Sequence, residues 1–128
     1  MAYLKSKLKL LESALLTLQE ALSMPYSAIV RDAAIQRYEF TFELLWKSIK
    51  IFLEEHEGIA SNSPKSSFRE VKSILGLTEE EVELCLQMCE DRNLSVHTYS
   101  EKLAKALYDK LNSYFSISKK IFEKISEE

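Results

Sequence analysis

The chain has 128 residues, of which 46% are hydrophobic and 29% charged, and its formal net charge is −3. This balance is too apolar for a disordered chain and too acidic for a domain that holds nucleic acid through general positive charge. No apolar run reaches the roughly 18 residues of a membrane span and no signal peptide opens the chain, so we expect one cytoplasmic domain over residues 1–128.

Two glycines and two prolines leave few places to break the chain, so we expect an all-α fold with long helices and few connections. The first predicted helix covers residues 3–23, and Met24 and Pro25 end it. Along it, leucines recur at alternating steps of four and three residues, which is the pattern of one buried helix face. These positions are Leu4, Leu8, Leu11, Leu15, Leu18 and Leu22.

The second predicted helix begins between Ser27 and Asp32 and ends near Glu57, before Gly58. Its buried seam is widened by Trp46, which we expect to be mostly buried. A second apolar stripe lies nearly opposite the seam, although a bundle helix needs only one. Either a segment of the same chain or another subunit covers this stripe, which makes it a candidate oligomer interface. The seam comprises Ile35, Tyr38, Phe42, Leu45, Ile49 and Phe52, and the stripe comprises Phe40, Leu44 and Ile51.

Three capping boxes, each a Ser or Thr followed three residues later by Glu, divide the second half of the chain. They predict a short helix ended by Gly76, a helix that runs to about Arg92, and a last helix that runs to about Ile125. The boxes are Ser67 with Glu70, Thr78 with Glu81, and Thr98 with Glu101. The last helix should bury Leu103, Leu107, Leu111, Tyr114, Ile121 and Ile125. The expected architecture is therefore an antiparallel up-and-down four-helix bundle with an additional short helix.

The two cysteines, Cys85 and Cys89, lie four residues apart on one helix face. A disulfide across one helical turn has poor geometry, and neither His56 nor His97 stands at a familiar zinc spacing. We therefore interpret the cysteines as buried thiols, and we expect no metal site and no cofactor. His56 is assigned no role.

One segment could carry chemistry, the run Arg92-Asn93-Leu94-Ser95-Val96-His97-Thr98-Tyr99 at the predicted junction of two helices. It places a cation, an imidazole and a phenol beside a helix N-terminus, which favours anions. Arginine can hold a phosphate with two hydrogen bonds, and histidine can move a proton near neutral pH. Asn93 and Thr98 are the supporting residues of this motif. The alternative from the residues alone is a helix corner in which Arg92 and His97 only satisfy caps and carbonyls.

Two stretches resemble the signatures of the nucleotidyltransferase substrate-binding protein family, a branch of the HEPN superfamily. They are residues 31–47, RDAAIQRYEFTFELLWK, and residues 92–99, RNLSVHTY. With the order of the helices, the resemblance covers nearly the whole chain. It implies a small four-helix bundle that forms a homodimer and is encoded beside a minimal nucleotidyltransferase.

The resemblance also implies roles for single residues. Arg92 and His97 match the superfamily hallmark of Arg, four to six residues, then His. In related toxin–antitoxin pairs the helical protein is a metal-independent RNase, and the nucleotidyltransferase neutralises it by adding AMP to the tyrosine two residues after the histidine, here Tyr99.

Three hypotheses about function follow. The leading one is a helical partner subunit that presents a nucleotide-related substrate, or Tyr99 itself, to the nucleotidyltransferase. The second is an RNase toxin that cleaves RNA with Arg92 and His97 as its catalytic residues. The third is a pure dimerisation module, in which the segment from Arg92 to Tyr99 would have no chemical role.

Overall fold

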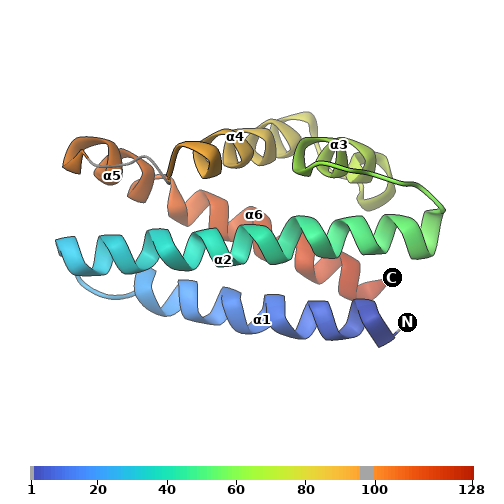
Figure 1. The fold of residues 1–128 in the computed structure, drawn as a ribbon, viewed down its shortest axis with the longest axis horizontal. Helices are drawn as coiled ribbons and strands as arrows, with labels where there is room; N and C mark the ends of the chain where they lie inside the picture. The colour runs from blue at the N-terminus through green and yellow to red at the C-terminus, as the bar shows by residue number, and fades with distance from the viewer. Residues whose placement is uncertain (1, 96–99) are drawn as a thin grey trace.

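The computed structural model describes residues 2–95 and 100–128 of the chain. Within these ranges it contains six α-helices, one π-helical turn and no strand (Figure 1). The four longest helices run alternately in opposite directions, which confirms the predicted all-α antiparallel bundle. The elements are α1 (Ala2–Leu22), α2 (Ala28–Phe52), η1 (Leu53–Glu57), α3 (Pro64–Leu75), α4 (Glu79–Ser95), α5 (Glu101–Tyr108) and α6 (Leu111–Glu127).

Helix α2 lies at the centre of the bundle and contacts every other helix in the described ranges. Figure 1 shows α1 on one side of it, α3, α4 and α5 on the other, and α6 behind it. All six residues of its predicted seam are buried. The Ser27 side chain caps α2 by accepting a hydrogen bond from the backbone N–H of Val30 at 3.0 Å.

Helix α1 packs antiparallel to α2 through the predicted leucines. Leu11, Leu15 and Leu18 are buried in the common core, whereas Leu8 and Leu22 lie at its edge. A polar contact supplements this packing, because Arg37 of α2 donates a hydrogen bond to the backbone oxygen of Thr17 at 2.7 Å. The leucine pattern therefore predicted the correct face of α1.

The start of α3 differs from the prediction. Ser63, not Ser67, is the N-cap, and its side chain accepts a hydrogen bond from the backbone N–H of Ser66. Pro64 occupies the first turn, where a missing N–H leaves no hydrogen bond unmade. Ser67 is instead buried inside the helix, and its hydroxyl bonds to the Ser61 hydroxyl at 2.7 Å.

The predicted capping box of α4 is confirmed. The Thr78 backbone N–H donates to the Glu81 carboxylate at 2.9 Å, and the Glu81 N–H donates to the Thr78 hydroxyl at 3.1 Å. Gly76, which separates α3 from α4, has a φ of 68°, in the left-handed region that glycine adopts without a steric penalty. The other end of α4 extends to Ser95, so Arg92 and Asn93 are helical residues.

The predicted last helix is two helices, α5 and α6, separated at Asp109 and Lys110. At the break the Lys110 N–H bonds to the Leu107 oxygen, a tighter step than in an α-helix. Ser100 caps α5, and the predicted cap Thr98 lies outside the described residues. Because α5 turns away from the line of α6, its inward positions are Ala104 and Leu107. The prediction that Leu103 is buried is therefore wrong.

The structure also places two residues of the second helix. Trp46 packs against the edge of the core with most of its surface buried, as predicted, and its indole N–H donates to Glu43 at 3.2 Å. Ile51 of the second apolar stripe is only 9% exposed and belongs to the core. The chain itself therefore covers one end of that stripe.

The burial of two aromatic residues predicts the cost of two substitutions. Phe52→Ala removes a fully buried ring and should lower the free energy of unfolding by roughly 3–5 kcal/mol. Trp46→Ala should also cost at least about 2 kcal/mol, because most of the larger indole ring leaves the core. Urea unfolding followed by circular dichroism measures both values. A loss below about 1 kcal/mol in Trp46→Ala would mean that its ring contributes little to the core.

Candidate functional site

The C-terminal end of α4 is fixed to α2 by ion pairs of Arg92. Its guanidinium Nη1 lies 3.2 Å from the Glu39 carboxylate, and its Nε lies 3.8 Å from Glu43. Glu39 and Glu43 are four residues apart, so they lie on one flank of α2 and both face α4. The Arg92 side chain remains 24% exposed, so these are partly buried pairs at the surface of the bundle.

A second set of contacts lies one residue earlier on α4. The Asp91 carboxylate accepts a hydrogen bond from the Tyr114 hydroxyl of α6 and pairs with Lys110 at 3.3 Å. Only 14% of the Asp91 side chain is exposed. Burial, followed by the hydrogen bond to Asp91, raises the pKa of Tyr114, which keeps its hydroxyl protonated and able to donate.

The rings of Tyr38 and Tyr114 connect these contacts to the core. They stack with centroids 5.6 Å apart, and the Tyr38 hydroxyl donates to the backbone oxygen of Met88 at 2.7 Å. Burial also raises the pKa of Tyr38. Helices α2, α4 and α6 therefore meet at this end of α4 through neighbouring sets of polar contacts, which we call the Arg92 network.

Two of the five predicted motif residues lie in this network or beside it. Arg92 is part of it, and Asn93 is exposed on the following position of α4. His97, Thr98 and Tyr99 lie outside the described residues.

The sequence reasoning missed the acidic partners of Arg92. From the sequence, no role is assigned to Glu39, Glu43 or Asp91. One sequence signal could have identified the two glutamates as partners of a neighbouring helix. They are four residues apart and lie beside the apolar seam, so both carboxylates point toward the next helix.

In the described part of the chain, ion pairs at this end of α4 involve the carboxylates of Glu39, Glu43 and Asp91 and the cations of Arg92 and Lys110. Among the described residues no group of three or more His, Cys, Asp or Glu side chains could hold a metal ion.

The cysteines behave as the sequence predicted. Both are buried and free. Burial raises the pKa of Cys85 to about 12 and that of Cys89 to about 11, so neither is a reactive thiolate at neutral pH.

The remaining part of the second apolar stripe is open to solvent. Phe40 is 59% exposed, and Leu44 is partly buried against the core. Phe40 directly follows Glu39 in the chain, so this part of the stripe lies beside the flank of α2 that carries the Arg92 ion pairs.

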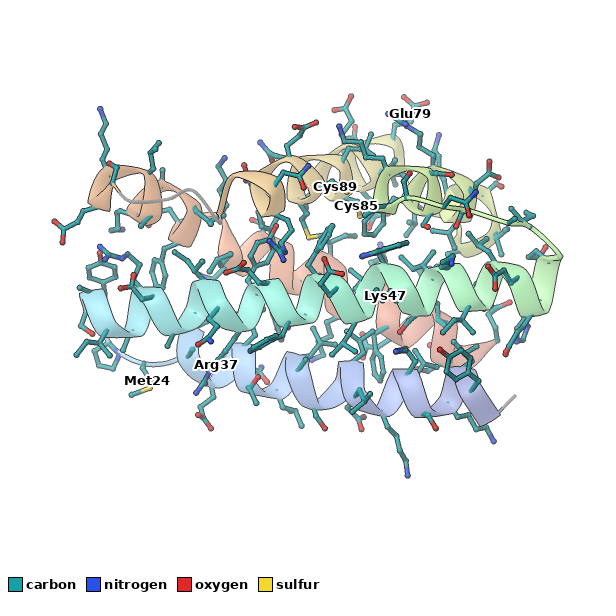
Figure 2. All side chains as sticks on the ribbon, viewed as in Figure 1. Met24, Arg37, Lys47, Glu79, Cys85 and Cys89 are labelled. Carbon is teal, nitrogen blue, oxygen red and sulfur yellow. The ribbon has the colours of Figure 1, made fainter. Side chains whose placement is uncertain are left out.

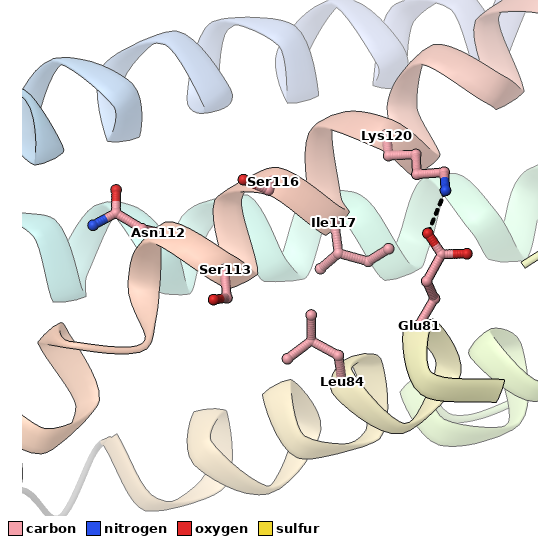
Figure 3. A pocket seen from close by; sticks show the side chains of 7 residues that line it. All are labelled: Glu81, Leu84, Asn112, Ser113, Ser116, Ile117 and Lys120. Atoms are coloured by element: carbon pink, nitrogen blue, oxygen red, sulfur yellow. Dashed lines mark hydrogen bonds and ion pairs between the residues drawn. The ribbon is translucent and has the colours of Figure 1, made fainter. Parts of the chain in front are cut away.

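A shallow groove of about 430 Å³ lies between α4 and α6 (Figure 3). Leu84 and Ile117 form its apolar part, and an ion pair between Glu81 and Lys120 closes one end. Asn112, Ser113 and Ser116 come from the outer side of α6. The groove shares no lining residue with the Arg92 network.

Comparison with known proteins shows the family to which the chain belongs. The family model described as nucleotidyltransferase substrate binding protein like matches residues 6–127. The chain belongs to this family. A crystal structure of a protein from Thermus thermophilus has the same fold, with a TM-score of 0.86. It is 40% identical in sequence, and the similarity covers 90% of this chain and 98% of that one.

A comparison with curated proteins gave no match. In the described parts of this family member, no helix is both long and apolar enough to cross a membrane. The family description names a nucleotidyltransferase, so a nucleotidyltransferase is the partner that membership implies for this chain.

The Asp91 network predicts different costs for two similar substitutions. Tyr114→Phe removes a hydrogen bond to a charged, poorly exposed carboxylate and should lower stability by roughly 1.5–3 kcal/mol. Tyr38→Phe removes a hydrogen bond to a neutral carbonyl and should cost only about 0.5–1.5 kcal/mol. Both variants keep the stacked rings, so urea unfolding compares the hydrogen bonds alone. A larger loss in Tyr38→Phe would contradict the assigned role of Asp91.

Proposed function

We propose that this chain is the helical partner, or substrate-binding, subunit of a two-component minimal nucleotidyltransferase system. It presents a nucleotide-related substrate, or its own Tyr99, to the partner enzyme. Membership of the nucleotidyltransferase substrate-binding family supports the partner role. The choice between presentation and RNA cleavage rests on the surroundings of Arg92.

The ion pairs of Arg92 are the observation that carries this choice. A catalytic arginine of an RNase must direct its guanidinium at a phosphate, but here two carboxylates of α2 already hold it. A phosphate that approached Arg92 would meet the carboxylates of Glu39 and Glu43, which opposes its binding. These contacts favour a role for Arg92 in holding the end of α4 in place.

The position of Tyr99 in the chain suits presentation. Residues 96–99 join Ser95, the last residue of α4, to Ser100, the N-cap of α5. Tyr99 is therefore attached directly to a helix start whose position is fixed. In the proposed reaction the Tyr99 oxygen attacks the α-phosphorus of ATP in the partner's active site. A new oxygen–phosphorus bond forms, the bond to the β-phosphate breaks, pyrophosphate leaves, and the phenol proton passes to solvent or to a base of the partner.

The second candidate function is a HEPN-type, metal-independent endoribonuclease toxin that uses Arg92 and His97 and is neutralised by AMP addition at Tyr99. One observation favours it, namely the 24% exposure of the Arg92 side chain at the end of the helix that leads to His97. An RNA substrate would have to displace Glu39 and Glu43, or a second subunit would have to supply further positive charge.

Self-association is part of the proposal. Phe40, with Leu44 beside it, forms an apolar surface next to the Arg92 network. A two-fold dimer through this surface would place the Arg92 networks of both subunits at one interface.

We expect Tyr99 to be the AMP acceptor. The purified chain, incubated with its co-encoded nucleotidyltransferase, ATP and magnesium, should gain the mass of one or more AMP groups. Tyr99→Phe should lose this gain while it still binds the partner, because the substitution removes only the attacking oxygen. Intact-mass analysis gives both results.

Two other outcomes would assign a different function to the chain. An unmodified wild-type chain that still binds the enzyme would leave presentation of another substrate as its role. RNA cleavage by the purified chain alone, retained in EDTA and lost in Arg92→Ala, would establish the toxin function in its place.

The dimer gives a separate prediction. Phe40→Asp should shift the protein toward the monomer in sedimentation at micromolar concentration, because it places a charge in the apolar contact. Leu10→Asp is the matched control, since Leu10 is similarly exposed but lies on α1. A wild-type protein that sediments as a monomer at high concentration would remove the dimer from the proposal.

A further inference from the structure

Exposed apolar side chains gather at one end of the bundle. Among the described residues eight large hydrophobic side chains are exposed, and four of them come from the α1–α2 loop, the first turn of α2 and the first turn of α5. Both segments lie at the same end of the molecule in Figure 1, and Figure 2 labels Met24 there. We call these four residues, Met24, Tyr26, Ile29 and Leu103, the end surface.

Contacts beneath the end surface hold its loop against α5. The Tyr26 ring packs edge-on against the Tyr108 ring with centroids 5.2 Å apart. The Lys105 ammonium lies 4.9 Å from the Tyr26 centroid and 5.7 Å from that of Tyr108, and it also pairs with Asp109. Tyr26 nevertheless remains 49% exposed. A side chain held in place while exposed loses little conformational freedom on binding, which favours a role in recognition.

The charges around the end surface are balanced. Residues 23–30 contain no charged side chain. On and directly after α5 the exposed Lys102 and Lys105 are balanced by the exposed Glu101 and Asp109, and Lys105 pairs with Asp109. The end surface is therefore apolar and without an excess of either charge, which suits burial against a folded protein.

The position of Tyr99 identifies the occupant. Leu103 is four positions after Tyr99 in the chain, so their Cα atoms are at most about 14 Å apart. A stable protein interface buries about 800 Å² on each partner, which is a disc of roughly 16 Å radius. An enzyme that brings its nucleotide to Tyr99 therefore covers Leu103 as well, and it can bury the neighbouring Tyr26 and Ile29 in the same contact.

We propose that the end surface is the docking surface for the nucleotidyltransferase, with Tyr26, Ile29 and Leu103 as apolar anchors. This inference rests on the proposed function and adds to it the face on which the enzyme binds. It separates two surfaces of the chain, since Phe40 on the outer side of α2 serves the second copy.

The test compares two leucines of equal exposure. Leu103 and Leu16 are each 61% exposed on a helix, but Leu16 lies on α1, away from the end surface. Leu103→Glu and Leu16→Glu add the same charge and keep a good helix former. Affinity for the co-encoded nucleotidyltransferase is measured by titration calorimetry without ATP. We expect Leu103→Glu to weaken binding at least about tenfold and Leu16→Glu to leave it unchanged.

A second variant tests whether Leu103→Glu weakens binding only because it disturbs α5 locally. Ile29→Glu lies on a different element and should also weaken binding, and circular dichroism should show unchanged helix content in all three variants. Enzyme binding by Leu103→Glu and Ile29→Glu with wild-type affinity would overturn the docking surface while leaving the proposed function intact. A shift of these variants toward the monomer, with normal enzyme binding, would assign the surface to a second copy instead. A wild-type chain that fails to bind the enzyme would overturn the proposed function itself.

Discussion

Helix α2 contacts every other helix in the described parts of the chain, so the arrangement of the bundle follows from how its sides are buried. Its seam packs into the core, and the flank that carries Arg37 lies against α1. The flank with Glu39 and Glu43 meets α4. Only the outer side, with Phe40, is left without a neighbour from the described parts of the same chain. A single helix thus determines where the core, the polar network and the open apolar surface lie.

The polar network has a structural cause in the sequence of α4. Its apolar residues do not form one clear stripe, because Leu84 and Leu86 are partly buried while Val82, Cys85, Met88 and Cys89 are buried. Apolar packing alone therefore specifies the rotation of this helix weakly. The hydrogen bonds from Tyr38 to Met88 and from Tyr114 to Asp91, and the ion pair between Arg92 and Glu39, supply directional contacts to two neighbouring helices. Partly buried hydrogen bonds of this kind favour one orientation over its neighbours.

The repeat of apolar residues was sufficient to predict the helices and most of the core. It succeeded for α1 and α2 because their seams are long and regular. It failed at Leu103, because spacing along the chain assumes a straight helix and the break at Asp109 and Lys110 has no glycine or proline to mark it. It also failed for Ser67, where the true cap Ser63 precedes a proline. Contacts between helices, such as Arg92 with Glu39, depend on rotation and register, which no single-helix pattern contains.

The chain segments before and after residues 96–99 differ in the chemistry of their exposed side chains, and this difference bears on the kind of partner they can bind. Before them, the end of α4 carries ion-paired side chains. After them, α5 and the α1–α2 loop expose apolar and aromatic groups beside lysines. A nucleic acid needs cations along its whole path, whereas a protein can match an apolar area with separate charged edges. This division of chemistry within one corner of the bundle suits recognition by a folded enzyme better than a track for an RNA strand. The Arg92 network then has a simple function, since it holds α4 in place while the opposite side of the segment is bound.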